Sequence, residues 1–121
     1  LSVAAYDADS NRLFLNSGRG YTQNEIIKPD LAAPGVSVTA PVAGGGYEAF
    51  TGSCAASALT AGATALLAQG GRQMRPPLTF TAQQVKMLFL RGSRQSSAYV
   101  YPNREWGYGT LDLYHTFELI V

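Results

Sequence analysis

The segment from Ala55 to Ala68 constrains the fold most, because as a helix it would carry small or apolar side chains on nearly every side. A helix with this pattern is typically buried all round. The remainder of the chain predicts three or four short strands and one other convincing helix, which is too little structure to surround it. We therefore expect the chain to complete its core with polypeptide outside it. The absence of a methionine before Leu1 also indicates an excised or processed piece.

The other elements are predicted from alternation, turn residues and capping patterns. Four strands, the first two forming a hairpin, are expected at residues 1–6, 12–15, 36–40 and 47–50. The helix that begins at Cys54 is expected to end before Gly70 and Gly71, because glycine commonly follows the last helical turn. Thr81 and Gln84 have the spacing of a capping box, which predicts a second helix after them.

Charge and composition exclude several classes of function. Nine Lys and Arg against eight Asp and Glu give a net charge of +1, and the basic residues are scattered, so no binding to nucleic acid is expected. Polar residues and glycine interrupt the longest apolar helical stretch, so no membrane span is expected. One cysteine cannot form an internal disulfide, and together with one histidine it falls short of a structural zinc site.

Cys54 is the candidate nucleophile, because it follows a strand and the turn residue Gly52 at the start of the buried helix. A helix N-terminus carries partial positive charge and unpaired N–H groups, which stabilise a thiolate and can receive a developing oxyanion. The alternative is a packed core cysteine. A nucleophile also needs a base. The only histidine, His115, lies far along the chain without a neighbouring carboxylate, and no dyad with Cys54 is expected.

Four segments, in order along the chain, resemble the C-terminal part of the catalytic domain of subtilisin-like serine peptidases, the subtilase or peptidase S8 family. Lys28-Pro-Asp-Leu-Ala-Ala-Pro-Gly35 matches the family's Lys-Pro-Asp-x-x-Ala-Pro-Gly block at every fixed position. Gly52-Ser-Cys-Ala-Ala-Ser-Ala-Leu-Thr-Ala-Gly62 resembles the nucleophile block Gly-Thr-Ser-x-Ala-x-Pro-x-x-x-Gly. Asn16-Ser-Gly-Arg-Gly-Tyr-Thr22 resembles a Ser-x-x-Gly loop, and Tyr101-Pro-Asn-Arg-Glu-Trp-Gly-Tyr-Gly-Thr-Leu-Asp112 a Gly-x-Gly closing motif. The residues are most similar to Csp-type germination proteases of spore-forming bacteria.

The resemblance implies an α/β fold, the three-layer subtilisin-like fold with a largely parallel sheet, of which residues 1–121 would be the C-terminal portion. It places Cys54 where the family has its nucleophilic serine, Ser53 where it has threonine, and Ala58 where it has proline. The supporting motif residues are then Gly52, Ser53, Lys28, Pro29, Asp30, Pro34 and Gly35. The catalytic Asp, the catalytic His and the oxyanion-hole Asn of the family would all lie upstream of Leu1.

The function implied is peptide-bond hydrolysis by the whole protein. Position 54 would attack the scissile carbonyl, an upstream His would act as base, and an upstream Asp would orient that His. The backbone N–H of Cys54 would supply half of the oxyanion hole. The expected partners are a peptide or protein substrate and the N-terminal remainder of the same domain, with no metal or organic cofactor. The chain by itself is expected to be inactive, because it carries one triad position of three.

Sulfur at position 54 leaves open whether the whole protein is an active peptidase, because sulfur is larger than oxygen and has a different proton affinity. Cys54 is a natural thiol variant, the mark of a natural pseudoprotease, or a deliberate replacement of serine. A pseudoprotease would act as a signalling or binding scaffold that keeps the fold and loses the chemistry. A third hypothesis, an unrelated small binding domain, requires both motif matches to be coincidental. The resemblance also implies a secreted, cell-envelope or spore location.

Two further patterns have a structural and a functional interpretation. Asp7-Ala-Asp-Ser-Asn11 has the opening spacing of a calcium loop, but Arg12 and Gly18 stand where that loop needs Gly and Glu, which favours a solvated hairpin turn. The aromatic residues of the C-terminal region are expected to pack over a sheet edge, with an aromatic binding face as the alternative. These residues are Tyr99, Tyr101, Trp106 and Tyr108.

Overall fold

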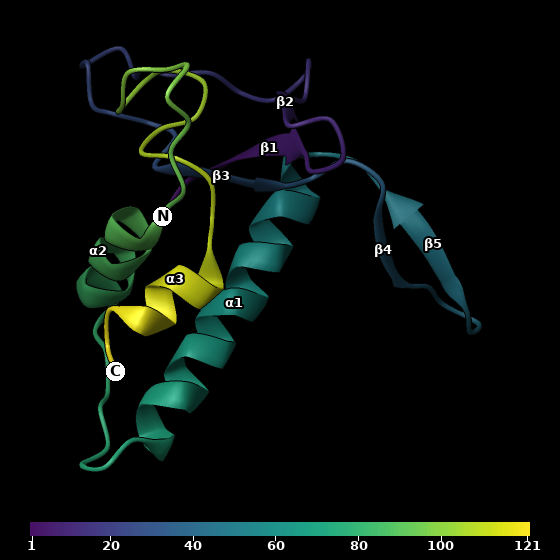
Figure 1. The fold of residues 1–121 in the computed structure, drawn as a ribbon. Helices are drawn as coiled ribbons and strands as arrows, with labels where there is room; N and C mark the ends of the chain where they lie inside the picture. The colour runs from purple at the N-terminus through teal and green to yellow at the C-terminus, as the bar shows by residue number, and fades with distance from the viewer.

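A computed structural model describes all 121 residues and arranges them as two small sheets and three helices (Figure 1). The strands are β1 (Val3–Asp7), β2 (Arg12–Leu13), β3 (Leu31–Pro34), β4 (Val38–Pro41) and β5 (Tyr47–Phe50). The helices are α1 (Ser53–Gln73), α2 (Ala82–Gly92) and α3 (Leu113–Glu118). None of these helices is both long enough and apolar enough to cross a membrane.

The larger sheet has the order β2–β1–β3, with β1 antiparallel to β2 and parallel to β3. Val3 lies opposite Leu31 in the parallel pair. Successive side chains of a strand point to opposite faces of the sheet. One face carries Ala5 and Ala33, which pack against Ala56 of α1. The small side chains on both elements let the long helix lie close against the sheet.

The main core forms where α1 and α2 meet the sheet. Leu31 of β3, Ala63 and Leu67 of α1 and Phe89 of α2 form one buried cluster, and α3 packs beside it. The second helix begins as predicted. The Thr81 hydroxyl accepts from the Gln84 N–H, and the Gln84 side chain accepts from the Thr81 N–H. The mixed α/β architecture is therefore confirmed.

The prediction for the end of the long helix is wrong, because α1 continues through Gly70 and Gly71 to Gln73. A Cβ atom at position 70 would lie 2.5 Å from a ring carbon of Phe117, and one at position 71 would lie 2.7 Å from a ring carbon of Phe80. The glycines therefore allow two aromatic rings to approach the helix, and they do not end it.

The strand expected at residues 36–40 is also wrong in its bounds. The structure has two strands there, β3 before Gly35 and β4 after it. The chain leaves the sheet at Gly35, whose N–H donates to the carbonyl oxygen of Tyr6 at 2.9 Å. The following β4 pairs only with β5, and this hairpin stands apart from the rest of the chain (Figure 1).

The long helix is not buried all round. Its buried residues form one stripe: Ala56, Thr60, Ala63, Leu67 and Gly71. On another face, Leu59 and Leu66 are 40% and 51% exposed. This open apolar face agrees with the expectation that the chain offers too little structure to surround the helix.

Candidate functional site

The end of β3 holds the start of α1 through two glycines. The N–H of Gly52, the residue before α1, donates to the carbonyl oxygen of Gly35 at 2.7 Å. A Cβ atom at position 35 would lie 2.6 Å from the Cβ of Ala5 and 2.7 Å from the Gly52 carbonyl oxygen. Only glycine therefore fits at position 35. The motif residues Pro34, Gly35 and Gly52 thus come together at the N-terminus of α1.

Cys54 is an exposed free thiol in the first turn of α1. The N–H groups of Ala55 and Ala56 donate to the carbonyl oxygen of Gly52. The N–H groups of Ser53 and Cys54 donate to no group of the chain. The first amides of a helix have no partner within it and are available to an anionic group. The arrangement therefore offers a thiol beside free N–H donors, the combination needed to attack a carbonyl and hold the resulting oxyanion.

Gly52 has a φ of +150°, which side chains rarely adopt, and a Cβ atom there would lie 3.3 Å from the Cys54 sulfur. We expect Gly52→Ala to destabilise the protein by about 1–3 kcal/mol, because alanine is strained in this conformation. The free energy of unfolding in urea is the measurement. Gly62→Ala is the matched control, since a Cβ there meets nothing within 4 Å and alanine favours a helix. Equal losses in both variants would contradict the prediction.

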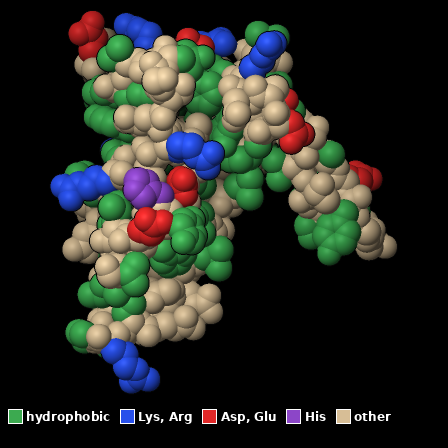
Figure 2. Space-filling model, viewed as in Figure 1, with side chains coloured by type: hydrophobic (Ala, Val, Ile, Leu, Met, Phe, Trp, Pro, Cys, Tyr) green, Lys and Arg blue, Asp and Glu red, His purple; other side chains and the backbone are tan.

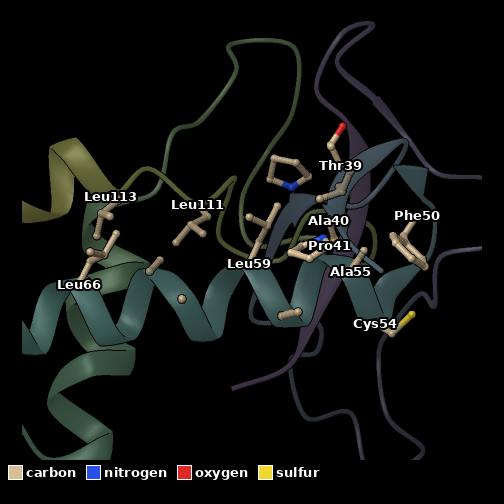
Figure 3. A pocket seen from close by; sticks show the side chains of 15 residues that line it. Thr39, Ala40, Pro41, Phe50, Cys54, Ala55, Leu59, Leu66, Leu111 and Leu113 are labelled. Atoms are coloured by element: carbon tan, nitrogen blue, oxygen red, sulfur yellow. The ribbon is translucent and has the colours of Figure 1, made fainter. Parts of the chain in front are cut away.

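An open apolar groove of about 970 Å³ begins at Cys54 and lies between α1 and the β4–β5 hairpin. Figure 3 shows Cys54 at one end, Phe50 beside it, and Leu59 and Leu66 along the helix. Figure 2 shows hydrophobic side chains around the hollow between the hairpin and the body. No charged side chain lines the groove. The sequence pattern indicated an excess of apolar helix surface but not the position of this groove, which depends on the hairpin.

The other motif residues do not line this groove. Ser53, Lys28 and Pro29 line a second hollow of about 310 Å³, which Cys54 does not reach. The hollow is more polar than the groove, and Arg19 also lines it. The two hollows therefore divide the motif residues into one group with Cys54 and Pro34 and another with Ser53 and Lys28.

Asp30 is a buried carboxylate at the start of β3. Its Oδ2 accepts from Lys28 Nζ at 2.8 Å and from the Ser2 N–H at 2.7 Å, and its Oδ1 lies 3.3 Å from Lys86 Nζ. Burial by itself would raise the pKa of Asp30. The hydrogen bonds from Lys28 and Ser2 and the nearby Lys86 lower the pKa by a larger amount, so the pKa of Asp30 lies below its ordinary value. Asp30 therefore ties the N-terminus and α2 to β3. The sequence did not indicate Lys86 as a partner of Asp30, because no local pattern links the two residues.

We expect Asp30→Asn to destabilise the protein by about 1.5–3 kcal/mol at neutral pH, the usual range for hydrogen bonds to a charged group. Because the folded pKa of Asp30 is lowered, its carboxylate stabilises the fold above its unfolded pKa. This contribution is lost as the pH falls below about 4 toward the folded pKa. Urea unfolding of both proteins between pH 7 and pH 3 measures the effect. A difference that stays constant over this range would contradict the assignment.

His115 lies on α3, where its Nδ1 is 3.1 Å from the carbonyl oxygen of Gly92 at the end of α2. This chain has one histidine, so no imidazole stands beside Cys54. The structure therefore does not bring His115 and Cys54 together as a dyad, as expected from the sequence. A base for the thiol would have to come from outside residues 1–121.

Comparison with known proteins shows the family of the chain. The model of the subtilase family, peptidase S8, matches residues 1–109. The CspB protease of Clostridium perfringens is 32% identical over 98% of this chain, with a TM-score of 0.89. The patellamide maturation protease PatA is 27% identical over 99% of the chain, with a TM-score of 0.77. The prenylagaramide maturation protease PagA, at 22% identity and a TM-score of 0.80, bears on the fold alone.

The chain spans between 26% and 42% of the length of these solved structures. No curated protein matches the sequence. The family model covers both glycine-linked motifs, from Lys28 to Gly35 and from Gly52 to Gly62, and the structural match extends over nearly the whole chain. The chain belongs to the subtilase family.

Proposed function

We propose that residues 1–121 are the C-terminal, nucleophile-bearing portion of a subtilase peptidase domain, and that the whole protein acts on peptide bonds through position 54. The observation that carries this proposal is the position of Cys54, an exposed thiol beside unpaired amides at the start of α1. The family model that spans these residues supports it. Gly35 and Gly52 support the site by setting where the helix begins.

The proposed reaction follows from these groups. A base supplied by the upstream part of the domain takes the thiol proton, and the sulfur attacks the scissile carbonyl carbon. The carbonyl oxygen becomes an oxyanion, which the Cys54 N–H stabilises. The leaving amine takes the proton from the base, and water then hydrolyses the thioester to release the acid and the free thiol. No step uses a metal or an organic cofactor.

The same proposal assigns the apolar groove to the upstream part of the domain. Leu59 and Leu66 are more exposed than the leucines of a complete hydrophobic core. The groove also begins at Cys54, whose sulfur needs a base. A segment packed in the groove would bury these side chains and end near Cys54. Its partners would then be this N-terminal remainder and a peptide or protein substrate.

The second candidate is a pseudoprotease that acts as a signalling or binding scaffold. The observation that favours it is sulfur where the family resemblance places a serine oxygen. Under this hypothesis the fold and the groove are kept and turnover is lost. From the resemblance to Csp-type proteases, we also propose a role in spore germination and a secreted, cell-envelope or spore location.

The test is hydrolysis of a generic peptide by the whole protein, with its own Cys54 and with Cys54→Ser. Turnover that appears or increases with serine supports the peptidase, and a folded serine variant without turnover supports the scaffold. The chain 1–121 alone should be inactive, because it contains no base beside Cys54. Turnover by this chain alone would contradict that part of the proposal.

A further inference from the structure

The hollow of about 310 Å³ that Ser53 lines takes half of its ten lining residues from one irregular loop, residues 18–22. Ser53 directly precedes Cys54, and its N–H donates to no group of the chain. A peptide whose carbonyl oxygen accepts from the free amides at the start of α1 would therefore place a neighbouring residue at this hollow. Because the upstream part of the domain is proposed to fill the apolar groove, the hollow is the space left for the substrate.

A turn near the C-terminus holds the loop 18–22, which forms no strand or helix. The Gly20 N–H donates to the Arg104 carbonyl oxygen at 2.8 Å, and Nη1 of Arg104 donates back to the Gly20 carbonyl oxygen at 3.2 Å. The Tyr21 hydroxyl donates to the carbonyl oxygen of Pro102 at 3.4 Å. The hydrogen bonds of Gly20 and Tyr21 thus all go to this turn.

The Arg104 side chain adds a contact with an aromatic ring of the same loop. Its Cζ lies 4.5 Å from the centroid of the Tyr21 ring, a cation–π arrangement. A Cβ atom at position 20 would overlap the carbonyl oxygen of Lys28, so only glycine fits there. Gly20 therefore contacts Lys28 and Arg104 at once, and these contacts set how far the loop stands from the hollow.

The turn that carries Arg104 is fixed by its own contacts. Asn103 and Gly107 exchange two backbone hydrogen bonds, at 2.9 and 3.0 Å, and Oδ1 of Asn103 accepts from the N–H groups of Glu105 and Trp106. Trp106 is buried in the cluster on the β1–β3 sheet. Arg104 itself is exposed and belongs to no core cluster. Its side chain therefore joins a fixed turn to the loop without contributing to the core.

We propose that Arg104 is a positioning residue for the peptide substrate, and that it holds the loop 18–22 as the wall of a hollow that receives a substrate residue next to the scissile bond. This inference rests on the proposed function, because its occupant is the peptide that Cys54 attacks. Arg104 lines neither the groove nor the hollow, so it acts only through the loop. A substrate misplaced by about 1 Å can react about 10²-fold more slowly, which makes the position of this wall important.

The substrate residue in the hollow is expected to be neutral and polar. Arg19 and Lys28 are the charged residues of its lining, and both are paired, Arg19 with Glu105 at 3.6 Å and Lys28 with Asp30 at 2.8 Å. A threonine hydroxyl can both donate and accept, so it fits a polar lining of either kind.

The test measures how fast Cys54 of the whole protein is alkylated. The probes are Ac-Ala-Ala-Thr chloromethyl ketone and chloroacetone, which has the same reactive group without the peptide. In both, the thiolate sulfur displaces chloride and forms a C–S bond, and the thiol proton goes to the buffer; mass spectrometry identifies the labelled residue. The unaltered protein should react at least about tenfold faster with the peptide reagent. Arg104→Ala should remove about tenfold of that rate and leave the chloroacetone rate unchanged.

Two further variants separate positioning from loss of structure. Arg104→Lys should restore part of the rate with the peptide reagent, because lysine keeps a cation over the Tyr21 ring but loses the planar fork. Arg75→Ala removes an exposed arginine of the loop between α1 and α2 and should change neither rate.

Three results would overturn the proposal: equal rates of the unaltered protein with the two reagents, an Arg104→Ala variant that keeps its rate with the peptide reagent, or an equal decrease with both reagents. Alkylation does not require turnover. A protein that is labelled as expected but hydrolyses no peptide, even with Cys54→Ser, would therefore contradict the peptidase and leave the role of Arg104 supported.

Discussion

Replacing Cys54 by serine in the whole protein should raise its turnover of a peptide amide by about 10²-fold or more, the lower range of general-base contributions. The reason lies in the tetrahedral intermediate. A thiolate leaves it more readily than an amine does, so most of the intermediate formed by Cys54 returns to substrate before the base has protonated the amine, and only a small part continues to the thioester. An alkoxide is a poorer leaving group, and the intermediate formed by serine expels the amine once the base has protonated it.

An activated ester as substrate separates the attack on the carbonyl from the departure of the leaving group. Its leaving group departs as easily as a thiolate, so the protein with Cys54 should hydrolyse the ester but only poorly the amide, and the Cys54→Ser variant should hydrolyse both. Cys54→Ala should hydrolyse neither, and Ser97→Ala, in an exposed loop beyond α2, should behave as the unaltered protein. If the folded Cys54→Ser variant hydrolyses neither substrate, the peptidase proposal fails and the scaffold is favoured.

Truncating Phe89 to alanine should destabilise the protein by about 3–5 kcal/mol, the usual cost of removing a buried aromatic ring. Phe89 is fully buried and contributes to the cluster that joins α2 to Leu31 of β3 and Leu67 of α1. The loss removes apolar surface from the core and leaves a cavity where the three elements meet. The decrease in the urea midpoint, with the slope unchanged, is the measurement.

Met87 provides the matched control for this prediction. It lies two positions before Phe89 on α2, and its side chain is half exposed. Met87→Ala should therefore cost no more than about 0.5 kcal/mol, as for other exposed substitutions. Similar losses for both variants would mean that α2 is not held by the buried cluster. A loss below about 1 kcal/mol for Phe89→Ala would have the same meaning.

Local sequence patterns predicted the elements whose contacts are local. The capping box joins Thr81 and Gln84 within one helical turn, and both of its hydrogen bonds form. The turn after β1 and the start of α1 near Cys54 were predicted from residues within a few positions of each other. Such interactions depend on the conformation of a short segment, which the order of residues largely determines.

The errors fall where distant contacts overrule a local preference. Gly70 and Gly71 commonly mark a helix end, but Phe117 and Phe80 pack against them and the helix continues. The Asp30 pair with Lys86 joins residues that are distant in sequence, and no spacing rule indicates it. Both depend on how α2 and α3 pack against α1 and β3.

The sequence by itself determined where α1 and α2 begin, the turn after β1, the position of Cys54 at a helix start, and, through its motifs, the subtilase family. These depend on short segments and on residue identities that can be read directly. Only the tertiary structure decided which face of α1 remains open, where the groove lies, and which groups partner Asp30. Those features arise where separate elements meet, and the relative placement of elements is set by the packing of the whole chain.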